Sequence, residues 1–389
     1  MAGGRACATT PERAEEQVIQ GVLNGAVALV AFLFMLGLLV LVHELGHFWT
    51  ARRLGIKVDE FGIGYPPRAA TLFERGGVRY TLNWIPIGGF VRFGGEGGDS
   101  IYGVGSLAAA PPWKKIAVLA AGPLMNLLLA ILIFVGLFLV NGAPQVVDGA
   151  RIGEVYPNTP AAAAGFQTGD VLLALAGQPI GQDTKAITAI ARAHKGEAIP
   201  AIVERGGQRV TLMVTPGPWT TPDGEQREVG FGFAYNAHLA LVPVGPLRAI
   251  ALGVATTFDL LGRFIEGLGQ LIGGLLGLNQ APPGGVTGVV GIARGTGEVI
   301  QRDGLTGFWQ WTALLSLNLF LFNLLPIPAL DGSHIMFALI ELARRGKKIP
   351  PEREAMVHAV GFMMLIGLMV VITFFDIRNW IGGASVLGG

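Results

Sequence analysis

The chain has 389 residues, of which 51% are apolar and 14% are charged, and its formal net charge is +1. This composition is typical of a polytopic membrane protein, and the near-neutral charge offers no broad basic surface for nucleic acid. The single cysteine, Cys7, excludes a disulfide within the chain. We therefore expect the lipid bilayer, and no nucleic acid, to be a partner of this protein.

The first long apolar run, residues 22–42, carries no charge and is long enough to cross a bilayer. An HExxH segment, His43 to His47, follows it directly. Residues four apart share a helix face, so His43 and His47 can direct two imidazoles at one Zn²⁺ ion while Glu44 reaches a water molecule beside it. An acid at mid-bilayer costs about 2.5–3.5 kcal/mol, which indicates a function for Glu44. We predict a zinc peptidase with Glu44 as its catalytic base.

A catalytic zinc ion usually has three protein ligands, so one further ligand is needed. A metzincin-type extension is excluded, because Thr50 and Arg53 stand where glycine and histidine would be required. Asp331 is the only carboxylate between residues 312 and 340, and it is the candidate third ligand. It could instead, or in addition, cap the helix that starts near Ser333, because Asp-Gly after prolines is also a turn signal.

The chain resembles the site-2 protease family of intramembrane zinc metalloproteases, in its bacterial RseP-type branch. The resemblance covers the chain from about Leu36 onward, with Gly332-Ser333 where the family often has Gly-Gly. Three motifs carry it: His43-Glu44-x-x-His47, Gly122-Pro123-x-x-Asn126, and Asn323-x-x-Pro326-x-Pro328-x-x-Asp331-Gly332.

The resemblance implies regulated intramembrane proteolysis in stress-response signalling. The implied substrates are single-pass membrane proteins of the anti-sigma factor type and signal-peptide remnants. The implied location is the bacterial inner membrane, with Zn²⁺ as cofactor.

The apolar runs predict a polytopic α-helical membrane protein with four transmembrane helices. Strand and turn signals add a small membrane-associated β-sheet, and a resemblance described below adds one extracytoplasmic PDZ domain of α+β type. The predicted segments are an N-terminal tail (1–21), the first span with HExxH (22–54), the sheet (55–95), the second span (112–141), the PDZ domain (146–216), a membrane-associated region (239–307), the broken third span (308–343) and the fourth span (355–377).

Positive charge predicts the orientation of these spans. Nine Lys or Arg residues lie in 51–115 and five in 343–355, so the positive-inside rule places both loops, and the active site, toward the cytoplasm. The stretch from Asn141 to about Gly307 is then extracytoplasmic.

The segment from Ile152 to Gly177 has the pattern strand, short helix, turn, strand, and resembles a PDZ domain that closes with strands 198–204 and 208–215. Such a domain can bind an extended peptide at an open edge, or can act as a steric size filter that binds nothing. In region 239–307, charged residues interrupt the apolar pattern, which favours helices lying against the membrane over a fifth span. This region could control access to the site or serve as a packing linker.

Short strands with turn signals between them are predicted at 56–64, 69–73, 78–84 and 90–93. A transmembrane helix bonds all its own backbone groups, so its scissile carbonyl is shielded until it unwinds and pairs with an edge strand. We expect substrate contacts from Gly88, Gly89 and Phe90, with Asn323 and Asn126 as further candidates. Helix packing is the alternative role for both asparagines.

Pro326 and Pro328 break the third span and are expected to bring Asp331 near His43 and His47. His334 is either a partner of the site or an ordinary packed histidine, and His358 shows no metal-like spacing.

Two other classes of function remain open. A membrane zinc transporter would need ligands spaced along a path, and a non-catalytic PDZ scaffold would not require His43, Glu44 and Asp331 together. A diiron membrane enzyme would need more than the six histidines present. A prenyl-protein peptidase would show more spans and no PDZ pattern.

Overall fold

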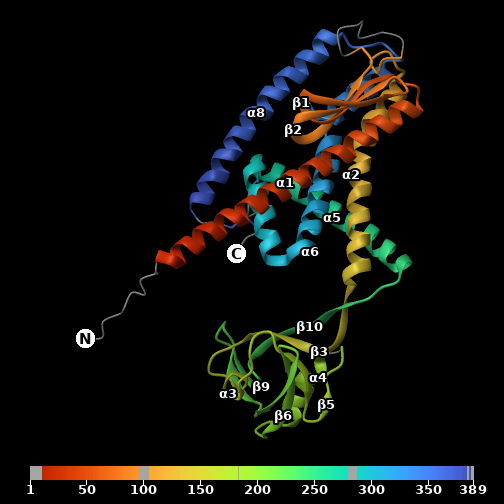
Figure 1. Cartoon of the computed structure of the whole chain (residues 1–389). Coiled ribbons are helices and arrows are strands. Elements are labelled where there is room, and N and C mark those ends of the chain that lie inside the picture. Colours follow the sequence, from red (N-terminus) through yellow and green to blue (C-terminus); the bar gives the residue numbers. More distant parts are fainter. Residues whose placement is uncertain (1–10, 96–104, 183, 279–286, 383–384, 387–389) are drawn as a thin grey trace. The chain divides into compact units, whose positions relative to one another are not determined.

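The computed structural model describes residues 11–95, 105–182, 184–278, 287–382 and 385–386. The chain divides into two compact units, which are described separately (Figure 1). The helical unit consists of Met1–Leu137 and Leu247–Gly389, and the β-rich unit of Phe138–Pro246.

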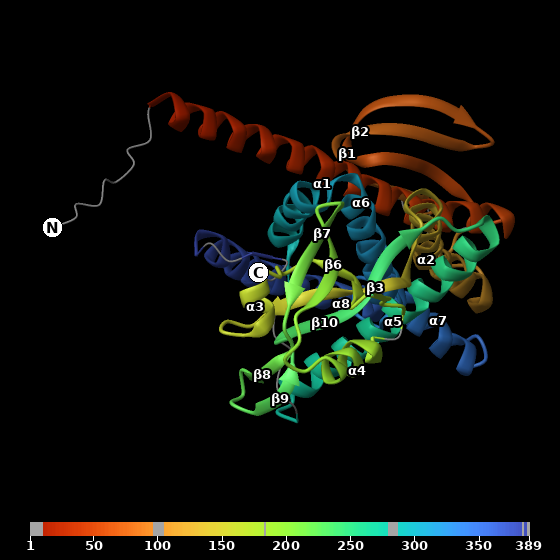
Figure 2. The same cartoon turned by 90° about the horizontal axis from the view of Figure 1, so that it is seen from below.

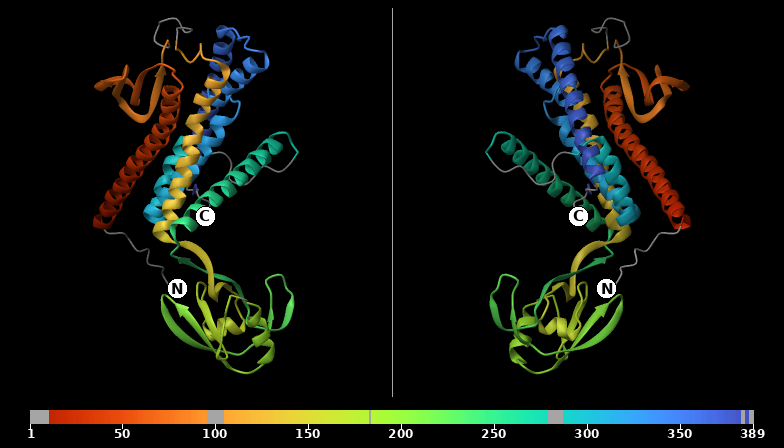
Figure 3. Two further views of the ribbon diagram at one scale, coloured as in Figure 1. Left: turned by 90° about the vertical axis from the view of Figure 1, so that its right-hand side faces the viewer. Right: turned by 90° about the vertical axis from the view of Figure 1, so that its left-hand side faces the viewer.

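Four helices in the described part of the helical unit are long and apolar enough to cross a membrane (Figure 3). A helix suits this role because all its backbone groups are bonded within the segment. The four helices are α1 (Pro11–Arg53), α2 (Pro112–Asn141), α6 (Val289–Leu324) and α8 (Pro351–Ile381).

Two of the helices extend beyond the predicted spans. α1 begins at Pro11, inside the predicted tail 1–21, although its part that could cross a membrane, Leu23–Arg53, agrees with the predicted span 22–54 within one residue at each end. α6 begins at Val289, inside the predicted region 239–307. Good helix formers such as Glu and Ala extend α1 beyond its apolar run. In α6 the ion pair of Arg294 with Glu298, four residues apart, supports the polar first turns.

The third predicted span, 308–343, is broken, as expected. Before that span begins, Gly304, with φ 61 and ψ −146, interrupts α6. α6 then ends at Leu324, and α7 (Asp331–Ala343) begins after Pro326 and Pro328. The prolines cannot continue the helix because they lack an N–H group. α5 (Pro246–Leu275) occupies much of region 239–307, of which residues 279–286 lie outside the described residues.

The predicted sheet is an antiparallel pair of two long strands, β1 (Val58–Arg75) and β2 (Val78–Phe93), where four short strands were expected. Phe61 pairs with both Val91 and Tyr80, so the first half of β1 lies between the two halves of β2. The Pro66-Pro67 and Gly88-Gly89 pairs lie inside the strands and do not end them.

A buried carboxylate joins the parts of this curled hairpin. Glu60 accepts hydrogen bonds from Arg68, Thr81 and Arg92, which come from both halves of β2 and from the second half of β1. The hairpin packs on the C-terminal end of α1, where Phe48 shares a buried cluster with Phe61. Burial of these large side chains holds the sheet beside the HExxH turn.

Packing between α1 and α6 forms a second core of the helical unit. Phe32, Met35 and Leu39 of α1 are buried together with Phe308 of α6. These residues recur at helical spacing on α1, so one face of that helix is buried in the bundle.

In its described residues, the β-rich unit contains eight strands and two helices (Figure 2). The strands are β3 (Ala143–Val155), β4 (Val171–Leu175), β5 (Gln178–Pro179), β6 (Ile199–Arg205), β7 (Gln208–Val214), β8 (Gly217–Thr220), β9 (Gln226–Gly230) and β10 (Phe233–Val242), and the helices are α3 (Pro160–Ala164) and α4 (Lys185–Ala193). Six of the strands form one sheet with the order β10-β3-β4-β6-β7, in which β5 pairs with β4, and β8 and β9 form a separate hairpin.

The predicted domain 146–216 is therefore too short at both ends. β3 begins at Ala143, and β10 pairs along almost its whole length, from Phe233 with Val155 to Val242 with Ala143. A strand that returns to the start of a domain leaves no local signal of its partner in the sequence. The predicted strands 198–204 and 208–215 agree with β6 and β7 within one residue at each end.

Candidate active site

The three predicted metal ligands meet at one point. His43 and His47 lie one turn apart on α1, and their Nε2 atoms are 3.1 Å apart. Oδ2 of Asp331, the first residue of α7, lies 2.9 Å from Nε2 of His43 and 3.5 Å from Nε2 of His47. Both histidines are buried, with 8% and 6% of their surface exposed.

This donor set fits a zinc ion. Ligand atoms about 2.0–2.1 Å from a tetrahedral zinc lie about 3.4 Å from one another, which is close to the separations of these three atoms. Two imidazole nitrogens and one carboxylate oxygen leave the fourth position open, as in catalytic zinc sites. The alternative role of Asp331 as a helix cap is wrong, because Leu330 occupies the N-cap position of α7.

Helix α2 lies directly behind the two histidines. Nδ1 of His47 is 2.8 Å from the backbone oxygen of Val118, and Nδ1 of His43 is 3.2 Å from Nδ2 of Asn126. A Cβ atom at Gly122 would overlap Nε2 of His47 and lie 2.8 Å from Nε2 of His43. The absent side chain of Gly122 therefore leaves room for both rings.

Glu44 points toward the hairpin and not into the bundle. Its Oε2 accepts a hydrogen bond of 3.1 Å from the backbone N–H of Val91 in β2. That N–H faces away from β1, so it belongs to the open edge of the sheet. The predicted base and the edge strand are therefore in direct contact.

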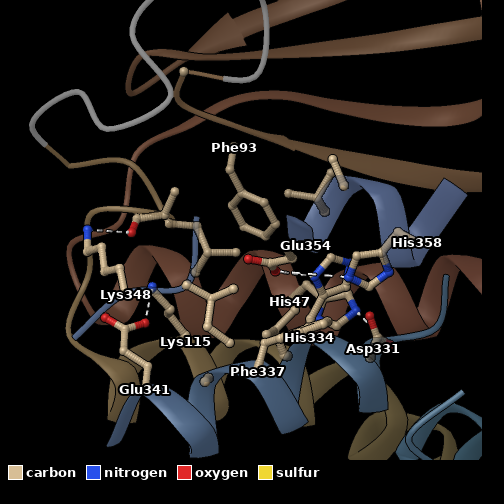
Figure 4. Close-up of a pocket in the computed structure, with 18 of the residues that line it drawn as sticks. His47, Phe93, Lys115, Asp331, His334, Phe337, Glu341, Lys348, Glu354 and His358 are labelled. Atoms are coloured by element: carbon tan, nitrogen blue, oxygen red, sulfur yellow. Dashed lines mark hydrogen bonds and ion pairs between the residues drawn. The ribbon is translucent and has the colours of Figure 1, made fainter. Parts of the chain in front are cut away.

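A cavity of about 630 Å³ opens beside these residues (Figure 4). Glu44, His47 and Asp331 line one part of it. Its apolar wall consists of Val91, Phe93, Leu107, Leu119, Phe337 and Ala338. A partly open cavity that combines an apolar wall with ionisable groups can hold a substrate segment.

Further ionisable groups line the cavity, and of these the sequence had indicated His334 alone as a possible partner of the site. Lys115 and Glu341 form an ion pair of 2.7 Å between α2 and α7. Nδ1 of His334 lies 3.3 Å from Oε1 of Glu354, and the rings of His334 and His358 stack with centroids 3.9 Å apart. Stacked imidazoles direct their nitrogens side by side, so this second group does not suit a shared metal ion. His334 therefore contacts α8 and not the metal ligands.

The five residues predicted to bind substrate do not line this cavity. Nδ2 of Asn323 donates to the carbonyl of Leu319 in its own helix, and Asn126 is fully buried behind His43. Gly88 packs on Val40 of α1.

The other two predicted substrate contacts also lie in packed surroundings. Gly89 lies close to the carbonyl of Gly62, and the ring of Phe90 lies over Gly62 and beside Arg92. Val91 and Phe93 line the cavity in their place. Side chains two residues apart on a strand share a face, so the sequence did contain a signal that Val91 and Phe93 lie on the same side of β2.

Comparison with known proteins agrees with this geometry. Residues 31–368 match the family described as Peptidase family M50. The zinc metalloprotease RasP of Oceanobacillus iheyensis is 30% identical, over 90% of this chain and 98% of its own length. The regulator of sigma-W protease RasP of Bacillus subtilis is also 30% identical, over 90% of this chain and 98% of its own.

A relative from Agrobacterium fabrum is 33% identical, over 93% of this chain and 98% of its own length. Among solved structures, the PDZ domain of the SdrC-like protein of Listeria innocua matches 23% of this chain and 97% of that chain, with 20% identity and a TM-score of 0.20.

Proposed function

The chain belongs to peptidase family M50 and is a metalloprotease, and on this premise we propose that it cuts peptide bonds within the transmembrane segments of single-pass membrane proteins. One observation carries the proposal. His43, His47 and Asp331 converge beside Glu44, and the two histidines and Glu44 lie on α1, a helix that is long and apolar enough to cross a membrane. Ionisable residues at such a depth are costly and usually mark a functional site.

In this proposal His43, His47 and Asp331 hold Zn²⁺. The bound ion would lower the pKa of a water molecule to about 7 and polarise the scissile carbonyl. Glu44 accepts a proton from the attacking water and transfers it to the nitrogen of the leaving amide. Its contact with Val91 keeps the carboxylate on the cavity side of α1.

The open edge of β2 is the proposed place for the substrate backbone. A substrate helix must unwind to expose its carbonyl groups, and the released groups need new hydrogen-bond partners in a place without bulk water. The backbone N–H of Val91 faces the cavity and can donate to an extended segment that pairs with β2. Asn323 could donate from the other side after leaving its bond to Leu319.

The finer assignments rest on the family resemblance. We propose anti-sigma factors and signal-peptide remnants as substrates, which agrees with the name of the Bacillus subtilis relative, regulator of sigma-W protease. We also propose that the β-rich unit is a PDZ domain on the extracytoplasmic side, where it binds a peptide or excludes bulky substrates. The active site then faces the cytoplasm across the inner membrane, as the positive loops predict.

The position of cleavage tests this function. Purified full-length protein in lipid vesicles would be incubated with a single-pass substrate already trimmed of its extracytoplasmic domain, and the product ends would be located by mass spectrometry. We expect a cut inside the transmembrane segment that a zinc chelator prevents. Cuts confined to the flanking soluble segments, or cleavage that survives the chelator, would contradict the proposal.

A further inference from the structure

Asn126 is the most deeply buried polar side chain at the site. It lies on α2, one turn after Gly122, and none of its surface is exposed. Its Nδ2 is 3.2 Å from Nδ1 of His43, whereas its Oδ1 has no hydrogen-bond partner among the described residues. A buried amide oxygen without a partner is costly, so its retention calls for a physical reason.

The two ring nitrogens of His43 have different neighbours. Nε2 lies 2.9 Å from Oδ2 of Asp331, and Nδ1 lies 3.2 Å from Nδ2 of Asn126. An amide nitrogen can only donate, so this orientation of the amide requires Nδ1 to accept and the ring proton to sit on Nε2. A ring protonated on Nε2 has no lone pair there for a metal ion.

Metal binding reverses these roles. A histidine that binds zinc through Nε2 carries its proton on Nδ1 and donates it to an outer partner, which fixes the ring orientation. His47 already has such a partner, because its Nδ1 is 2.8 Å from the carbonyl oxygen of Val118. For His43 the acceptor must be Oδ1 of Asn126, which reaches Nδ1 when the amide turns by half a rotation.

The backbone at this position is held in place. Ser316 of α6, which is fully buried, donates a hydrogen bond of 2.8 Å to the backbone oxygen of Asn126. The turn of the amide therefore requires no movement of α2. With its backbone fixed, the side chain of Asn126 can either donate to His43 through Nδ2 or accept from it through Oδ1.

We propose that Asn126 is a positioning residue for zinc, which accepts the Nδ1 proton of His43 through Oδ1 when the metal is bound. This inference rests on the proposed zinc site. It replaces the substrate contact expected for Asn126 from the sequence. Because His43 is one of the proposed zinc ligands, loss of its outer partner is expected to weaken zinc binding.

Two substitutions separate accepting from donating. Asn126→Asp keeps an acceptor and removes the donor, whereas Asn126→Leu removes both and keeps the branched shape of the side chain. The zinc dissociation constant of the purified full-length protein would be measured by competition with a chelator. We expect Asn126→Leu to weaken zinc binding about 10–100-fold, and Asn126→Asp to bind zinc at least as tightly as the wild type.

Thr257→Val is the matched control. Thr257 is fully buried on α5, and its hydroxyl donates 2.8 Å to the carbonyl of Gly253, away from the metal ligands. This variant also loses one buried hydrogen bond, so it reports the general effect of such a loss. Its zinc affinity is expected to equal that of the wild type.

A measurement on the wild type needs no variant. Nitrogen NMR of protein with ¹⁵N-labelled histidine would locate the ring proton of His43 with and without zinc. We expect the proton on Nδ1 in the zinc-loaded protein and on Nε2 in the metal-free protein.

Wild-type zinc affinity in Asn126→Leu, loss of affinity in Asn126→Asp, or a zinc-loaded ring without a proton on Nδ1 would overturn the inference. A wild-type protein that binds no zinc would instead overturn the proposed function.

Discussion

At the scale of single residues, each metal-binding histidine is held by a second contact on its far side. Val118 supplies a backbone oxygen for His47, and Asn126 supplies an amide for His43. Such outer partners fix the ring orientation and raise the basicity of the ligand. Both partners come from α2, so this helix contributes to the site without supplying a ligand.

Gly122 gives the sharpest test of this arrangement. In Gly122→Ala the new Cβ atom would overlap the Nε2 atom of His47 and crowd that of His43. We expect zinc affinity, measured by chelator competition, to fall at least about tenfold. Gly136→Ala on the same helix is the control, because a Cβ atom there meets nothing within 4 Å. Equal zinc affinities for the two variants would show that α2 is not packed against the histidines as described.

Asp170 makes the stability of the β-rich unit dependent on pH. Burial raises the pKa of this carboxyl, but hydrogen bonds from Arg205 and from the N–H of Gln167 outweigh it and hold the pKa below its ordinary value. A lowered pKa in the folded state stabilises the unit above about pH 4, and this stabilisation is lost as the pH falls through the folded-state value.

Amide hydrogen exchange in the full chain would measure this dependence in strands β4 and β6, which pair beside Asp170. We expect the free energy of opening to fall as the pH is lowered from 5 toward 2. In Asp170→Asn the free energy should be about 2 kcal/mol lower at neutral pH and should change less with pH. If the free energy of opening depended on pH equally in the wild type and in Asp170→Asn, Asp170 would not be the source of the pH dependence.

Much of the site could be predicted at this scale, for two physical reasons. The spacing of His43 and His47 fixes their common helix face, and Asp331 is conspicuous as the single acid in an apolar stretch. Val118 could not be predicted, because it acts through its backbone. Glu354 and His358 could not be predicted either, because their approach to His334 depends on how α8 packs.

At the scale of elements, the β1-β2 hairpin is the proposed place where a substrate is presented. Its edge is exposed to the cavity through the N–H of Val91, and Glu60 ties the curled strands together. An extended substrate that pairs with this edge would lie beside Glu44. The N–H group of Val91, which here donates to Glu44, would then donate to the substrate instead.

Val91→Pro removes this N–H and leaves the pairing with β1 intact, because the N–H faces away from β1. We expect kcat/KM for a transmembrane substrate to fall at least about tenfold, since one backbone hydrogen bond is lost, while zinc affinity is unchanged. Val91→Ala keeps the N–H and is the matched control, with a smaller loss. A proline variant as active as the alanine variant would exclude pairing at this edge.

The number and order of elements could be predicted better than their ends. Apolar runs identified the four long helices, but polar residues with high helix propensity extended α1 beyond its run. The added turns of α6 instead contain buried glycines, among them Gly291, Gly295 and Gly297. In the hairpin, Gly88-Gly89 reads as a turn signal, whereas the structure uses these glycines to pack β2 closely on α1. The close approach of a neighbouring helix cannot be deduced from the strand's own sequence.

At the scale of the whole molecule, the active-site residues all belong to one of the two compact units. His43, Glu44, His47 and Asp331 lie in the helical unit, and the β-rich unit is inserted between α2 and α5. The ligands on α1 and α7 are 288 residues apart in the chain, so folding of the complete helical unit is needed to assemble the site. The proposed chemistry thus depends on the helical unit alone.

The central claim is that Glu44 performs proton transfer in an intramembrane zinc peptidase. Its most direct test compares wild type and Glu44→Gln, both purified with zinc, in cleavage of one trimmed single-pass substrate in the same lipid vesicles. The account predicts equal zinc content in the two proteins and a loss of cleavage of about 10²–10⁴-fold in the variant. Equal cleavage by both proteins would contradict it.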